Sequence, residues 1–152
     1  MTTLPRRCRR NVSILLAVFC QIVLLTSAGV AQADLRLLMG GQARDVTTAE
    51  DLQVQLMIVL AEQGPSRLEG RLDGSSLSAE IAASGGPVGP CRRGHVCMLF
   101  TGTANGRDVG GRDVGGALTV GLEIEPGLTG ASGVYVIGAR RLGRFAVQRA
   151  ED

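Results

Sequence analysis

Residues 67–81 read RLEGRLDGSSLSAEI, two alternating runs joined at an Asp-Gly pair. In the first run Leu68 and Leu72 alternate with charged residues, and in the second Leu77, Ala79 and Ile81 alternate with polar ones. A period of two is typical of a strand that is buried on one face. Asp-Gly is a preferred pair for a two-residue hairpin turn. The stretch therefore predicts a β-hairpin.

A two-residue turn also predicts the register of this hairpin. It pairs Leu72 with Ser75 and, further out, places Arg67 opposite Glu80. Apolar residues then meet apolar residues on one face, an agreement that a one-residue slip would lose. We therefore predict an Arg67–Glu80 cross-strand pair on the solvent face.

The same alternation continues on both sides of the hairpin. The clearest run is 117–125, and further strands are predicted over 35–39, 95–103, 133–138 and 144–149. Apolar residues occupy both faces of 95–103, which predicts a central strand covered on both sides.

Residues 48–63 carry two conflicting signals. Five apolar residues alternate as in a strand: Leu52, Val54, Leu56, Ile58 and Leu60. The preceding Thr-Thr-Ala-Glu and the following Gly-Pro instead resemble a helix start and a helix stop. We favour a strand, because the alternation is long and includes β-branched residues.

These runs add up to about eight strands, joined mostly as neighbours. The expected fold is all-β, a small antiparallel β-barrel. A β-sandwich is the first alternative, and an α+β fold is the second if residues 48–63 are helical. Leucine, valine and isoleucine are expected to line the interior, so any interior ligand would be apolar.

The first 33 residues have the composition of a secretory signal peptide. A head of four arginines precedes an apolar run from Val12 to Leu25, and the segment ends with Ala31 and Ala33. A basic head, an apolar centre and an A-x-A end predict a signal helix that is cleaved before Asp34. The apolar run is 14 residues long, whereas a spanning helix needs about 20.

Cleavage there would leave residues 34–152 as a single β-rich domain. We expect this domain to be exported, to the periplasm or the extracellular space, with membrane contact only through the signal segment before cleavage. The formal net charge would fall from +2 to −2, because four of the 16 basic residues and none of the 14 acidic ones precede Asp34. A nucleic-acid partner is not expected, since such binders are basic.

Two cysteines remain after the signal segment, Cys91 and Cys97. An even pair in an oxidising compartment predicts a disulfide. The pair encloses Arg92, Arg93 and the only histidine, His95. Three potential ligands at an unfamiliar spacing do not predict a metal site, and no cofactor is expected.

Catalytic motifs are scarce. There is no G-x-S-x-G sequence, so a serine hydrolase of that type is not indicated. Glu123 and Glu125 would share a strand face, which solvent exposure explains. We predict no catalytic residues, and a hydrolase that uses His95 is the least favoured alternative.

Residues 106–115 are a tandem duplication, GRDVG followed by GRDVG. Asp108 and Asp113 could suggest calcium, but that ion takes six to eight oxygen ligands. An expanded surface loop is the simpler interpretation, because added loop length costs little free energy.

Four arginines near the C-terminus could bind an anionic partner: Arg140, Arg141, Arg144 and Arg149. Solvated charge around a hairpin turn explains them more simply.

The functional expectation is an exported, non-enzymatic β-barrel that binds a partner protein of the cell envelope or a small apolar ligand. The alternative is an inhibitor of an extracellular enzyme, which would present Arg92 and Arg93 on the Cys91–Cys97 loop. A preordered loop lowers the entropic cost of binding. An open apolar interior would favour the ligand, and a filled interior with a protruding cysteine loop would favour the inhibitor.

Overall fold

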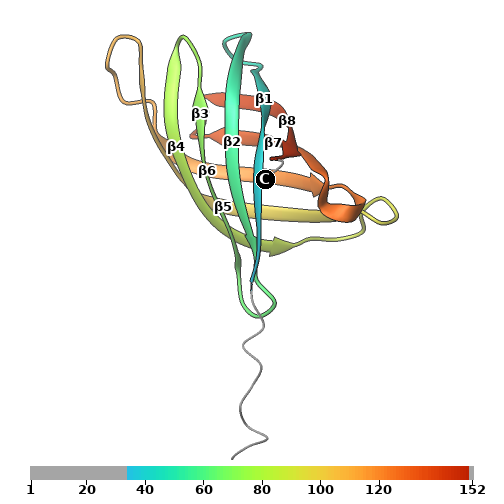
Figure 1. Ribbon diagram of the computed structural model, residues 1–152. Helices are drawn as coiled ribbons and strands as arrows, with labels where there is room; N and C mark the ends of the chain where they lie inside the picture. The colour runs from blue at the N-terminus through green and yellow to red at the C-terminus, as the bar shows by residue number, and fades with distance from the viewer. Residues whose placement is uncertain (1–33, 151–152) are drawn as a thin grey trace, which may run out of the picture. The chain divides into compact units, whose positions relative to one another are not determined.

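Eight antiparallel strands form a closed barrel in the computed structural model, which describes residues 34–150 (Figure 1). Each strand pairs with the next along the chain, and the last strand pairs with the first. The strands are β1 (Leu35–Asp45), β2 (Glu50–Leu60), β3 (Ser66–Asp73), β4 (Leu77–Pro87), β5 (Val96–Asp108), β6 (Gly116–Ile124), β7 (Gly130–Ile137) and β8 (Arg141–Arg149). The expected all-β barrel is confirmed, and the ambiguous segment 48–63 contains a strand, β2.

One short 3₁₀ turn, η1 (Pro126–Leu128), lies between β6 and β7. Within residues 34–150 no helix is long and apolar enough to cross a membrane. The predicted signal helix, with Ala31 and Ala33, lies outside the described residues.

Alternate side chains of every strand point into the barrel, as the period of two requires. In β6 the buried positions are Leu118, Val120, Leu122 and Ile124, the four that the sequence predicts. The largest fully buried side chains are Tyr135 and Phe100.

These side chains fill the barrel. The void that they leave between strands on opposite sides has a volume of about 10 Å³, which is the space of a single water molecule at most. An apolar ligand therefore has no room at this position.

The β3–β4 hairpin has a different register from the one predicted. Arg71 lies opposite Glu80, and Arg67 lies opposite Ser84. The predicted Arg67–Glu80 pair is therefore wrong. The register is displaced by four residues because the strands stop pairing at Asp73 and Ser78, leaving a longer turn than a two-residue one. An even displacement leaves every side chain on its predicted face.

The last hairpin also differs in its bounds. Its strands are longer than the predicted 133–138 and 144–149, and the turn is shortened to Gly138–Arg140. Gly138 has a φ of 58°, a conformation that glycine adopts without steric cost.

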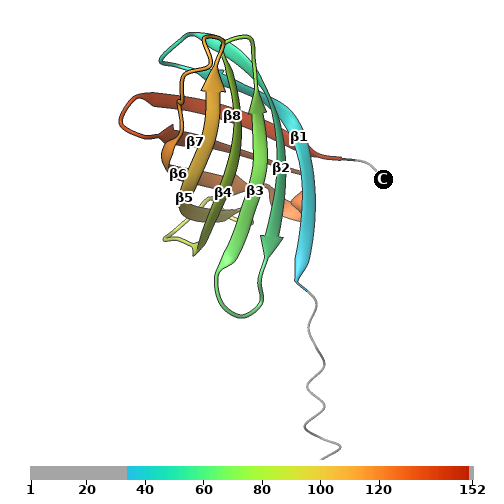
Figure 2. The same ribbon diagram turned by 90° about the vertical axis from the view of Figure 1, so that its left-hand side faces the viewer.

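Figure 2 shows β1 to β4 side by side on one wall of the barrel. The outer positions of β2 to β4 carry many charged residues, among them Asp51, Arg67, Glu69, Arg71 and Glu80. The outer face of β2 to β4 is therefore strongly charged.

Candidate functional site

The loop between β4 and β5 is closed by a disulfide between Cys91 and Cys97, as predicted, with an S–S distance of 2.04 Å. Inside it the His95 amide donates to the Arg92 carbonyl at 2.9 Å. Gly94 completes the turn with a φ of 81°, which disfavours other residues. The two sulfur atoms are bonded to each other, so neither is a free thiolate for a metal.

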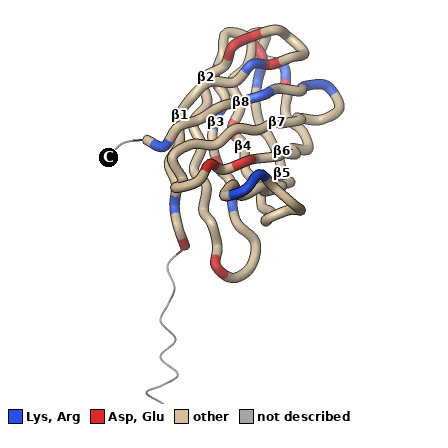
Figure 3. The backbone as a smooth tube through the Cα atoms, turned by 90° about the vertical axis from the view of Figure 1, so that its right-hand side faces the viewer, with Lys and Arg blue, Asp and Glu red and all other residues tan. Residues whose placement is uncertain are grey.

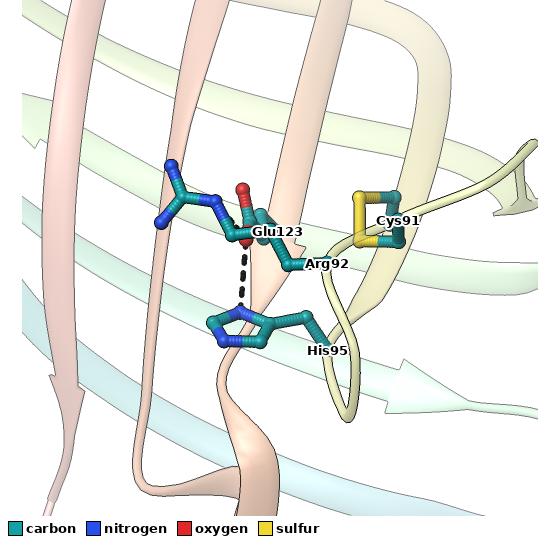
Figure 4. Close-up of a disulfide and its surroundings, with 5 residues drawn as sticks. Cys91, Arg92, His95 and Glu123 are labelled. Atoms are coloured by element: carbon teal, nitrogen blue, oxygen red, sulfur yellow. Dashed lines mark ion pairs between the residues drawn. A yellow bond between two sulfur atoms is a disulfide. The ribbon is translucent and has the colours of Figure 1, made fainter.

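Two side chains of the loop contact one carboxylate of β6 (Figure 4). His95 Nδ1 lies 2.9 Å from Glu123 Oε1, and Arg92 Nε lies 3.4 Å from the same oxygen. The His95–Glu123 contact is close, but its orientation is not that of a hydrogen bond. Glu123 is opposite Cys97 across β5 and β6. The disulfide and the Arg92–Glu123 ion pair therefore connect the loop to β5 and β6.

His95 has no hydroxyl partner. Among the described residues, no serine, threonine or tyrosine hydroxyl hydrogen-bonds to it. Its charged neighbour is Glu123, which it shares with Arg92.

The arginines of the loop lie on its solvent side. Arg92 has a side-chain exposure of 79% despite its contact with Glu123. Arg93 is exposed as well, and it forms no ion pair with another residue of 34–150. The predicted partner loop therefore presents at least one uncompensated positive charge.

Beside this loop, the outer faces of β5, β6 and β7 form an apolar groove. Leu99, Gly121 and Val134 lie opposite one another on the three strands, and Gly121 has no side chain to fill the space between its neighbours. Exposed fractions are 43% for Leu99 and 44% for Val134. The depression here has a volume of about 570 Å³, and we call it the outer groove. Its lining includes Val88, Leu99, Gly121, Ser132, Val134 and Arg144.

The prediction that strand 95–103 is covered on both sides is wrong within the described chain. The barrel core covers only the inner face, so Leu99 is exposed on the outer face. Val96, the first residue of β5, is 41% exposed. The apolar character that suggested a central strand instead marks an uncovered surface.

Charged residues are few on the strands that form the groove floor. β6 contains one, Glu123, and β7 contains none. Figure 3 shows this side of the barrel, with the loop arginines at one edge of the largely uncharged β6 and β7. The outer surface of the barrel is therefore asymmetric, because β2 to β4 are richly charged.

Arg144 borders the groove from β8. It lies opposite Val134 on one side and Arg44 of β1 on the other. Arg44 is paired with Asp51 at 2.8 Å, whereas Arg144 forms no ion pair with any described residue. The guanidinium of Arg144 is therefore available to an external anion.

The four C-terminal arginines do not form one cluster. Arg141 points inward and pairs with Asp45 at 3.3 Å, while Arg144 points outward and Arg149 ends the strand. Side chains alternate between the two faces of β8, so Arg141 and Arg144 lie on opposite sides of the strand. Of the four arginines, only Arg144 lines the outer groove.

The duplicated segment 106–115 forms a hairpin extension at the opposite end of the barrel. Arg112 of the second copy forms an ion pair with Asp108 of the first at 3.0 Å. The backbones of Arg107 and Asp113 form an isolated antiparallel β-bridge. Two Arg-Asp copies that run antiparallel place each arginine near an aspartate of the other copy. Asp108 and Asp113 also accept backbone amides of their own loop, so both carboxylates have a role in the turn.

Gly121 is the site residue that the sequence did not single out. A glycine inside a strand can mark a close approach by another chain or ligand, and that was the available signal. No family model, no curated protein and no solved structure matches this chain. Its function must therefore be inferred from geometry and chemistry.

Proposed function

We propose that the protein is an exported, non-enzymatic β-barrel that binds a partner protein through the outer groove and the Cys91–Cys97 loop. The observation that carries this proposal is the uncovered apolar row of Leu99, Gly121 and Val134 on a barrel whose core is filled. A partner that covered this row would remove its apolar surface from water.

The filled interior supports a site on the outside. A void of about 10 Å³ cannot hold a ligand, so a binding function is best served by the outer surface. A partner that covered the exposed parts of Val88, Leu99 and Val134 would remove apolar area from water. Burial of apolar area is favourable by roughly 25 cal/mol per Å².

The disulfide supports the exported location. Disulfides persist in oxidising compartments and are rare in the cytosol, and the Cys91–Cys97 bond is formed here. The basic, apolar and A-x-A segments before Asp34 point to the same compartment.

Filling the groove is expected to remove the partner. We expect the protein to retain a partner from an extract of the producing cell's envelope and medium, and the variant Gly121→Leu to lose at least nine-tenths of it. A Cβ at Gly121 would meet only Val134 Cγ2 at 3.5 Å, so the variant should fold. Quantitative mass spectrometry of the captured proteins, with circular dichroism as the folding check, measures both.

Gly40 provides the matched control. It is an outward glycine on β1 with no atom within 4 Å of an added Cβ, and it is outside the groove. Gly40→Leu should capture the same partner as the natural protein. Equal capture by both variants would show that the outer groove is not the binding site.

The second candidate is an enzyme inhibitor, and the exposed Arg93 on a disulfide-closed loop favours it. Trypsin-like proteases hold an arginine in a pocket with a buried aspartate. If the loop fills such a pocket, Arg93→Ala should weaken inhibition of a trypsin-like protease at least 100-fold, while Arg149→Ala should not change it. A panel of such proteases assayed with a chromogenic substrate tests this, and no inhibition at micromolar protein would reject the candidate.

A further inference from the structure

We infer that the outer groove takes an extended protein segment in which an aliphatic side chain and a carboxylate lie two residues apart. This inference rests on the proposed function, because it names the chemistry of the partner at the same surface.

The aliphatic position lies above Gly121. Leu99 and Val134 form the two walls, and the backbone of β6 forms the floor. An added Cβ at Gly121 has a single ordinary contact, so the space above the floor is open. A branched aliphatic side chain would touch apolar atoms on three sides.

The carboxylate position lies at Arg144. Its guanidinium has no ion-pair partner among residues 34–150, whereas its neighbour Arg44 is paired with Asp51 at 2.8 Å. Glu123, the only acidic residue on β6, is already in contact with His95 and Arg92. Glu123 also lines the groove, so the uncompensated positive charge lies at Arg144, which favours an acidic group within the screening length of about 8 Å.

Strand spacing fixes the separation of the two positions. Neighbouring strands lie about 4.8 Å apart, and Gly121 and Arg144 are two strands apart through Val134. The backbone separation is therefore roughly 10 Å, whereas side chains on one face of an extended segment are spaced by about 7 Å, every second residue. The length of the arginine side chain covers the remaining distance, so we expect a spacing of two residues between the aliphatic group and the carboxylate.

The segment must bind through side chains. Every strand of the barrel is paired on both edges, so the partner cannot add a strand to the sheet. The groove thus binds the aliphatic group and the carboxylate and leaves the partner backbone exposed.

A random linear 12-residue peptide library displayed on phage tests the inference with a defined probe. Peptides enriched on the natural protein and not on Gly121→Leu should share an aliphatic residue with Asp or Glu two positions away. Synthetic versions should bind at least tenfold more weakly to Arg144→Glu, and replacing their acidic residue by arginine should restore binding to that variant. Arg149→Glu, at the end of β8, is the matched charge control and should bind like the natural protein.

Three results would overturn the inference. The first is a groove-dependent set of peptides without a carboxylate. The second is equal binding of acidic peptides to the natural protein and to Arg144→Glu. The third is binding of laurate that Gly121→Leu abolishes, with no enriched peptide, because it would assign the groove to a fatty acid. In the first two cases, partner loss in Gly121→Leu would still support the proposed function, so the two failures are distinguishable.

Discussion

Gly143→Ala is expected to lower the free energy of unfolding by about 3 kcal/mol, the upper part of the usual range for overpacking. Gly143 lies opposite Tyr135 across β7 and β8, and a Cβ there would overlap the Tyr135 ring. The ring cannot move aside, since Tyr135 is 2% exposed in a filled core. Urea denaturation followed by far-UV circular dichroism measures the loss.

A second substitution separates the clash from other causes. Tyr135→Leu shortens the side chain, so Gly143→Ala should cost less than about 1 kcal/mol in that background, as a volume-compatible change would. Gly40→Ala, where an added Cβ meets no atom within 4 Å, should be nearly neutral. An equal cost of Gly143→Ala with and without the Tyr135 ring would contradict the explanation.

Asp45→Ala is expected to cost about 3–5 kcal/mol, the range for removing one partner of a buried ion pair. Asp45 is completely buried at the end of β1, where Oδ1 accepts the amides of Thr47 and Thr48 at 2.8 and 3.1 Å. Its Oδ2 accepts from Arg141 Nη1 at 3.3 Å. The alanine variant loses both amide caps and leaves a largely buried guanidinium without its partner.

Two further variants divide this cost. Asp45→Asn keeps an oxygen for the Thr47 and Thr48 amides but removes the charge, so its loss reports on the Arg141 contact. Arg141→Met removes the guanidinium, and Asp45→Asn should then cost at least about 1 kcal/mol less than in the natural protein. Additive losses in this double-mutant cycle, measured by urea denaturation, would show that the ion pair contributes nothing.

The strands and their inner faces could be predicted because a period of two is a local property of the sequence. The register of the β3–β4 hairpin could not. Gly74 donates its amide to the Leu77 carbonyl at 2.7 Å, and Glu50 of β2 accepts from the Ser75 hydroxyl and the Ser76 amide. Glu50 precedes the turn by more than twenty residues, so the Asp-Gly pair alone gave the wrong turn length.

The candidate site likewise has one part that the sequence predicts and one part that it does not. The Cys91–Cys97 bond follows from two cysteines close in sequence. The outer groove requires Leu99, Gly121 and Val134 to align on three strands, and that alignment depends on the registers of two hairpins. Neither register is visible in one segment, so the sequence indicated apolar residues on β5 without indicating that they remain uncovered.

Closure of the barrel joins the first described strand to the last. Met39 of β1 lies opposite Arg149 of β8, so this contact forms only after nearly the whole domain has been synthesised. Until then one edge of β1 has free amide and carbonyl groups, which can template pairing with other chains. Such non-local closure slows folding, and we expect the nascent chain to be most prone to aggregation in the interval before β8 emerges.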